Sequence, residues 1–163
     1  MYRRMLLAYD GSLEGRVALR EGAIIARHCQ AEVFLLAAVA APVSVDSMGT
    51  AVAVPCDFDD ILQGGLQRAR ALGLAASGAV VYSTPIEAIA ERAKNWPADV
   101  VVMGQENRSR WSKFFSEPKC AALIDRLSCS LLICKTAISD EMFALAVTPT
   151  IEKQAPRAAL KRR

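Results

Sequence analysis

The chain has 163 residues and is 53% hydrophobic, and this length and composition fit one compact domain with a sizeable core. Its net charge of +3 is mild. Its apolar runs are shorter than the roughly 20 residues that a membrane helix needs, so we expect no membrane span and no membrane partner. Five cysteines without a C-x-x-C spacing and a single histidine, His28, argue against a disulfide framework and a zinc site.

The N-terminal third predicts a strand, a helix and a second strand. Residues 5–9 ("MLLAY") form a short apolar run, too short for a signal peptide, so we interpret them as a strand of a cytoplasmic protein. Ser12 suits the N-cap of a following helix, whose apolar stripe is expected to consist of Leu13, Val17 and Ile24. Residues 32–39 are almost continuously apolar, which is typical of a parallel strand covered on both faces.

The remaining elements continue the alternation of strands and helices. After a predicted loop over residues 42–55 we expect helix 57–72, strand 77–82, a helix opened by Thr84 and Pro85, and strand 100–103. A helix with the apolar face Cys120, Leu123, Ile124 and Leu127 then precedes a last strand at residues 131–134. This order predicts a doubly wound parallel sheet with ligands at the carboxyl ends of its strands. Residues 136–163 are expected to be an extension, partly or wholly disordered.

Three segments resemble the universal stress protein family: "LLAYDGSLEGRVALREGAIIA", "TPIEAIAERAKNWPADVVVMG" and "DRLSCSLLIC". The resemblance covers residues 1–135 in the right order. It implies one α/β domain with a five-stranded parallel sheet of order 3-2-1-4-5 and helices on both faces, of the adenine-nucleotide alpha-hydrolase-like, Rossmann-like or flavodoxin-like kind. It also implies a cytoplasmic stress-response protein that is usually a homodimer, often through the last strand, here residues 131–134.

The same resemblance points to a nucleotide motif that this chain does not keep. In the ATP-binding branch, the motif's first glycine falls on Gly104, its second on Asn107, and its terminal Gly and Ser or Thr on Glu117 and Pro118. Proline has no N–H to offer a phosphate, and a glutamate repels one, so the loss is about two to five decades of affinity. We therefore predict a degenerate site and no cofactor. Glu117 and Pro118 instead suit the start of a helix.

The segment "SRWSKFF" replaces the motif and is similar to the linker of the non-ATP-binding, universal stress protein A-like branch. Trp111, Phe114 and Phe115 are expected either to fill the space of a nucleotide or to pack a loop onto the domain. Asp10, Gly11 and Ser12 would approach adenine and ribose in the ATP-binding branch, but also make a plain turn. The full vestigial set is Asp10, Gly11, Ser12, Val39, Met103, Gly104, Asn107, Glu117 and Pro118.

Two functions follow from these patterns. The first is a stress-response protein that acts by dimerisation and contact with an unidentified protein partner, with no enzymatic activity, because no catalytic constellation is visible. The alternative is a regulatory switch that binds ATP or AMP weakly through Asp10, Gly104 and arginines such as Arg108 or Arg110. The basic end of the chain, "APRAALKRR", indicates a solvated tail more than a nucleic-acid surface.

Overall fold

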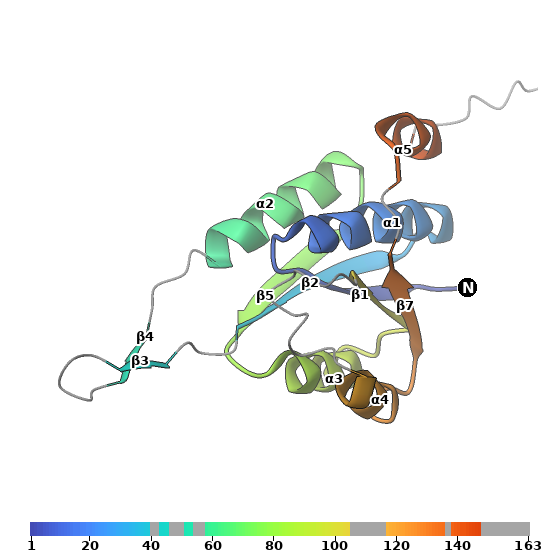
Figure 1. The fold of residues 1–163 in the computed structure, drawn as a ribbon. Helices are drawn as coiled ribbons and strands as arrows, with labels where there is room; N and C mark the ends of the chain where they lie inside the picture. The colour runs from blue at the N-terminus through green and yellow to red at the C-terminus, as the bar shows by residue number, and fades with distance from the viewer. Residues whose placement is uncertain (40–42, 46–50, 54–57, 105–116, 136–137, 148–163) are drawn as a thin grey trace, which may run out of the picture.

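The structure is a computed structural model that describes residues 1–39, 43–45, 51–53, 58–104, 117–135 and 138–147 (Figure 1). Its centre is a five-stranded sheet made of β1 (Arg4–Ala8), β2 (Glu32–Ala38), β5 (Ala76–Val81), β6 (Val100–Gly104) and β7 (Ser130–Cys134). All neighbouring pairs are parallel, and the order is β5-β2-β1-β6-β7. Counted along the chain this is the order 3-2-1-4-5, so the predicted fold class is confirmed.

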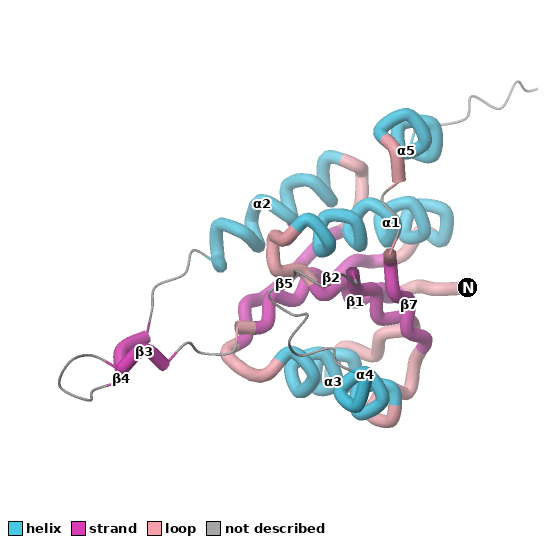
Figure 2. Tube along the Cα trace, viewed as in Figure 1, coloured by secondary structure: helices cyan, strands magenta, loops and turns pink. Residues whose placement is uncertain are grey.

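Helices cover both faces of the sheet (Figure 2). α1 (Leu13–Cys29) and α2 (Phe58–Ala71) lie on one face, and α3 (Pro85–Asn95) and α4 (Glu117–Ile124) lie on the other. Successive residues of β1 alternate between the two cores, as strand geometry requires. Met5 and Leu7 pack under α1 and α2, whereas Leu6 and Ala8 pack in the second core with residues of α3 and α4.

The buried face of α1 differs from the predicted one. It is made mostly of small residues: Gly15, Ala18, Leu19, Gly22, Ala23 and Ala26. A methyl group added at Gly22 would lie 2.9 Å from Leu7 Cδ2, so the helix approaches the sheet too closely for large side chains. The predicted stripe was therefore right only in part: Leu13 is 68% exposed, whereas Val17 is half-buried and packs against the core, and Ile24 is half-buried.

The face predicted for α4 was right only in part. The helix begins at Glu117 and ends at Ile124, before Leu127. Leu123 is fully buried and Leu127 is half-buried against the same core, but Ile124 is 55% exposed. The side chain of Cys120 lies outside the described part of the chain. Adjacent positions such as 123 and 124 point in different directions on a helix, so only one of them can face the sheet squarely.

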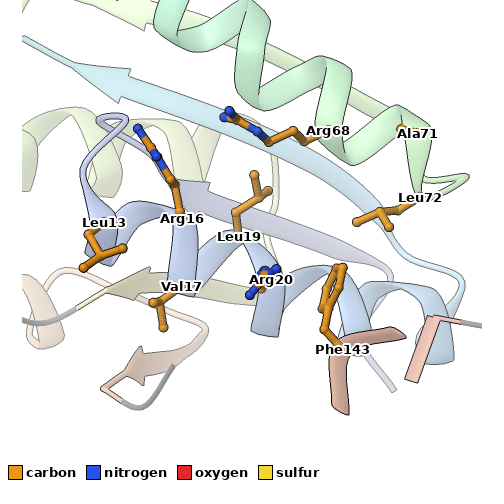
Figure 3. A pocket seen from close by; sticks show the side chains of 9 residues that line it. All are labelled: Leu13, Arg16, Val17, Leu19, Arg20, Arg68, Ala71, Leu72 and Phe143. Atoms are coloured by element: carbon orange, nitrogen blue, oxygen red, sulfur yellow. The ribbon is translucent and has the colours of Figure 1, made fainter. Parts of the chain in front are cut away.

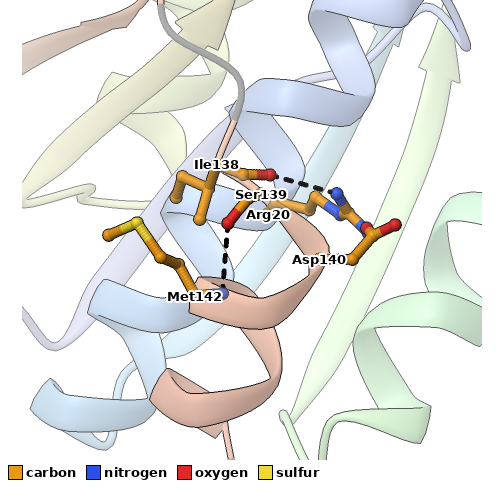
Figure 4. A network of polar contacts seen from close by, with 5 residues as sticks. All are labelled: Arg20, Ile138, Ser139, Asp140 and Met142. Carbon is orange, nitrogen blue, oxygen red and sulfur yellow. Dashed lines mark hydrogen bonds and ion pairs between the residues drawn. The ribbon is translucent and has the colours of Figure 1, made fainter.

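Two further pieces of structure were not predicted. β3 (Val43–Val45) and β4 (Ala51–Ala53) form a short antiparallel pair within the segment expected to be a loop. The C-terminal extension contains α5 (Asp140–Val147), which packs outside α1. The start of α5 had a sequence signal, because Ser139 Oγ accepts the N–H of Met142 at 3.2 Å and Asp140 lies in the first turn (Figure 4).

Arg20 of α1 ties α5 to the domain. Its guanidinium forms an ion pair with Asp140 and donates a hydrogen bond to the carbonyl oxygen of Ile138 at 3.3 Å. It also lies 4.9 Å from the centre of the Phe143 ring. The side of α1 that faces away from the sheet is thus partly covered by a third layer.

Adjacent glycines of α2 give a matched test of this close packing. A methyl group at Gly65 would lie 2.6 Å from Tyr9 Cε1, whereas at Gly64 nothing lies nearer than Arg68 Nη1 at 4.0 Å. Gly65→Ala should lower the free energy of unfolding by about 1–3 kcal/mol through overpacking. Gly64→Ala should raise it by about 0.5–1 kcal/mol, because alanine is the better helix former. Urea unfolding of both variants checks this, and equal effects would contradict the described packing of α2.

Candidate functional site

The predicted site lies where strands of the sheet end. β1 leads into Tyr9 and Asp10, β2 into Val39, and the neighbouring β6 ends at Gly104. The chain first adds β2 and β5 on one side of β1 within the sheet, and then adds β6 and β7 on the other side. The direction of winding therefore reverses between β1 and β6. Ligands of doubly wound sheets bind at such a point. The structure therefore brings six members of the predicted set to one edge: Asp10, Gly11, Ser12, Val39, Met103 and Gly104.

Two members of that set are core residues. Val39 is 4% exposed, and its N–H donates to the carbonyl oxygen of Val81 at 2.8 Å. Met103 is 2% exposed and packs in the core that also contains Ile89 and Leu123. Their burial is accounted for by the sheet itself.

Asp10, Gly11 and Ser12 build the turn that starts α1. Asp10 Oδ1 accepts the N–H of Ser12 at 3.0 Å and also the Ser12 hydroxyl. Ser12 Oγ in turn accepts the N–H of Gly15 at 3.0 Å, which makes Ser12 the N-cap, as predicted. Gly11 has φ +76°, and a methyl group there would lie 2.7 Å from Ile61 of α2. Local structure is thus enough to explain why each of the three residue types is present.

One atom of this turn is not explained by it. Asp10 is only 7% exposed, and its Oδ2 has no hydrogen-bond partner among the described residues. Leaving a buried polar oxygen without a partner costs free energy, and the cost is larger for a charged group. Asp10 Oδ2 therefore has acceptor capacity to spare at the edge of the sheet where ligands of this fold bind.

Gly104 is the motif position that the chain keeps, and its surroundings are crowded. A methyl group at Gly104 would lie 2.3 Å from the carbonyl oxygen of Glu14 and 2.6 Å from its carbonyl carbon. Both are backbone atoms of the first turn of α1, which cannot move aside as a flexible side chain can. The packing of the end of β6 against α1 is therefore enough to require a glycine here.

The positions of the terminal motif pair start a helix. Glu117 is the first residue of α4 and Pro118 is the second. Proline is tolerated there because the first N–H groups of a helix have no partner within it, and a carboxylate is favourable near the positive end of the dipole. Asn107, Arg108 and Arg110 lie outside the described residues. So do the three aromatic residues of the replacement segment, Trp111, Phe114 and Phe115.

Two cysteines and the histidine have contacts that indicate a structural role. Burial raises the pKa of the Cys134 thiol far above its ordinary value, and a hydrogen bond with Glu21 raises it further. Burial likewise raises the pKa of Cys129, so both thiols stay protonated and are poor nucleophiles. The Nδ1 atom of His28 lies 2.9 Å from the carbonyl oxygen of Ile24, one turn earlier on α1. Within the described ranges, no three histidine, cysteine, aspartate or glutamate side chains are placed to hold a metal.

The family model described as "Universal stress protein family" matches residues 1–135. The chain belongs to the universal stress protein family. No curated protein is similar enough in sequence to count as a match. None of the described helices of this universal stress protein is long and apolar enough to cross a bilayer.

Solved structures of the family share the fold. A universal stress protein in complex with cAMP is 22% identical, with a TM-score of 0.61 over 81% of this chain and 95% of that one. The universal stress protein UspA from Lactobacillus plantarum is 18% identical, with a TM-score of 0.58 over 82% and 97%. The protein from Archaeoglobus fulgidus in complex with dAMP is 15% identical, with a TM-score of 0.58 over 81% and 97%. These likenesses establish the fold.

Proposed function

We propose that this universal stress protein acts in the cytoplasm during the stress response by self-association and contact with a protein partner, without tightly bound ATP and without catalysis. The observation that supports the proposal most is the start of α4 at Glu117 and Pro118, the positions that would carry the family's phosphate-binding pair. It supports the further proposal that the chain is most similar to the universal stress protein A-like branch.

The free energy lost at these positions is large enough to matter. Pro118 offers neither an N–H nor a hydroxyl, and a hydrogen bond to a charged group contributes about 1.5–3 kcal/mol. Glu117 places a negative charge next to phosphate, which costs about 1 kcal/mol in water and about 4 kcal/mol near a protein surface. Together these weaken a nucleotide by about two to five decades in affinity. Gly104, the matching position, is accounted for by its contact with Glu14.

Titration calorimetry with ATP and ADP tests the absence of a tight site. We expect no saturable binding tighter than about 100 µM, the dissociation constant of a micromolar site that has lost about two decades of affinity. The matched variant restores the motif with Asn107→Gly, Glu117→Gly and Pro118→Ser together, and should bind ATP at least tenfold more tightly than the wild type. Saturable binding by the wild type below about 100 µM would overturn the proposal.

A second candidate function is a switch that binds ATP or AMP, and the unpartnered Oδ2 of Asp10 favours it. Two solved relatives are complexes with cAMP and dAMP, which shows that adenine nucleotides bind other proteins of this fold. The switch would use Asp10, Gly104 and arginines such as Arg108 or Arg110. Thermal stabilisation by ATP or AMP that disappears in Asp10→Ala would support it, and a flat response would count against it.

Self-association is proposed through β7, an edge strand that pairs on one side with β6. An edge strand presents N–H and C=O groups to another chain. The N–H of Ser130 points inward and donates to the carbonyl oxygen of Asp99 at 3.1 Å. Because these groups alternate in direction along a strand, the N–H groups of Leu131 and Ile133 point away from β6. Their side chains are half-buried in the single chain.

A proline at position 133 tests this edge. Ile133→Pro removes an outward N–H but no bond to β6, so the chain should fold and lose its dimer. Ile133→Ala is the control, because it loses the same side chain and keeps the N–H. Sedimentation should show a dimer for the wild type and the alanine variant, and a monomer for the proline variant. A wild-type monomer, or a proline variant that still dimerises, would contradict pairing through β7.

A further inference from the structure

A cavity of about 490 Å³ lies between α1, α2 and α5, on the outer side of the helices that cover one face of the sheet (Figure 3). Its volume falls within the range of about 300–1,000 Å³ that small-molecule sites occupy. Neither Asp10 nor Gly104 lines it, but one end adjoins the strand-end site, since Arg16 bonds to Gly11 and Arg68 to Tyr9. α5, which packs outside α1, contributes Phe143 to its wall.

The lining divides into a cationic and an apolar part. In Figure 3 the guanidinium groups of Arg16 and Arg68 lie toward the same end, one from each of the two facing helices. Leu72 and Phe143 lie toward the opposite end, with Leu19 between. A molecule that lies along this cavity would meet positive charge at one end and hydrocarbon at the other.

The two arginines at the cationic end have neutral partners. Arg16 Nε donates to the carbonyl oxygen of Gly11 at 3.2 Å, and Arg68 Nη1 donates to the hydroxyl of Tyr9 at 3.1 Å. Arg20 differs, because it is paired with Asp140. Among the described residues, no carboxylate pairs with Arg16 or Arg68. Each guanidinium has five N–H donors, and these contacts within the described part of the chain use one donor of each, which leaves others that can bind an anion.

We propose that this cavity binds a single-chain amphiphile with an anionic head group, such as a medium-chain fatty acid or an alkyl phosphate. Its head would lie between Arg16 and Arg68, and its chain would cover Leu19, Leu72 and Phe143. Burial of each methylene and the charge-assisted hydrogen bonds of the head both favour the complex. The chain's own C-terminus is a poor occupant, because residues 157–163 are basic and would be repelled by the arginines.

Calorimetric titration of the full chain with sodium decanoate and decyl phosphate tests the proposal. We expect saturable one-to-one binding of at least one of them, and the stronger of the two identifies the head group. Decanol and decyltrimethylammonium, which keep the chain but lack the negative charge, should bind at least tenfold more weakly. Hexanoate should bind at least tenfold more weakly than decanoate, because four methylenes are missing.

Three variants place the ligand in the cavity. Arg16→Gln should weaken binding of the anionic probes about tenfold or more, since a charge-assisted bond is lost. Ala71→Phe adds a ring at an exposed helix position that lines the cavity, and should abolish binding without unfolding the chain. Arg3→Gln removes the same charge from an exposed position outside the cavity, and should bind as the wild type does.

Several results would overturn the proposal. One is that neither anionic probe binds saturably at concentrations up to about 1 mM. A dissociation constant of about 1 mM corresponds to a binding free energy of about −4 kcal/mol. Another is equal binding of the anionic, neutral and cationic probes, which would mean nonspecific adsorption to exposed apolar surface. The third is wild-type affinity in both Arg16→Gln and Ala71→Phe, which would place the ligand elsewhere.

Discussion

The close approach of α1 to the central strands is the constraint on which the rest of this structure depends. Gly22 lets the helix lie against Leu7 of β1, and Gly104 lets the end of β6 lie against the backbone of Glu14. Interiors are packed closely enough that one added methyl group is felt. This contact holds the first turn of α1 beside the strand ends, and with it the Asp10 and Ser12 turn. It also leaves Leu13, Arg16 and Arg20 away from the sheet, on the side of α1 where the cavity lies.

The sheet could be predicted from the sequence because its strands are short, almost wholly apolar runs separated by amphipathic helices. The buried face of α1 could not be predicted from hydropathy, because that pattern favours Leu13, Val17 and Ile24 over the glycines and alanines that touch the sheet. α5 was not predicted, although Ser139 and Asp140 are a usable cap signal. A short apolar helix beyond a complete fold has no partner that a sequence pattern can reveal.

The candidate site shows the same difference between local and long-range information. The N-cap role of Ser12 and the helix start at Glu117 and Pro118 depend on neighbours in sequence, and they follow from residue type alone. The crowding of Gly104 by Glu14 and the unpartnered oxygen of Asp10 depend on segments far apart in the chain, so only the structure reveals them. Arg16 and Arg68 likewise meet across two helices. No spacing in the sequence indicates that pair.

In the proposed account, Gly104 is present because α1 packs against it, whether or not a nucleotide binds. The most direct test is the stability of Gly104→Ala, measured by thermal and urea unfolding with and without ATP. The account predicts that the variant loses about 2–3 kcal/mol without ATP, since backbone atoms of Glu14 must shift, and that ATP changes neither protein. The contradicting result has two parts. Without ATP the variant would be as stable as the wild type, and ATP would stabilise the wild type but not the variant.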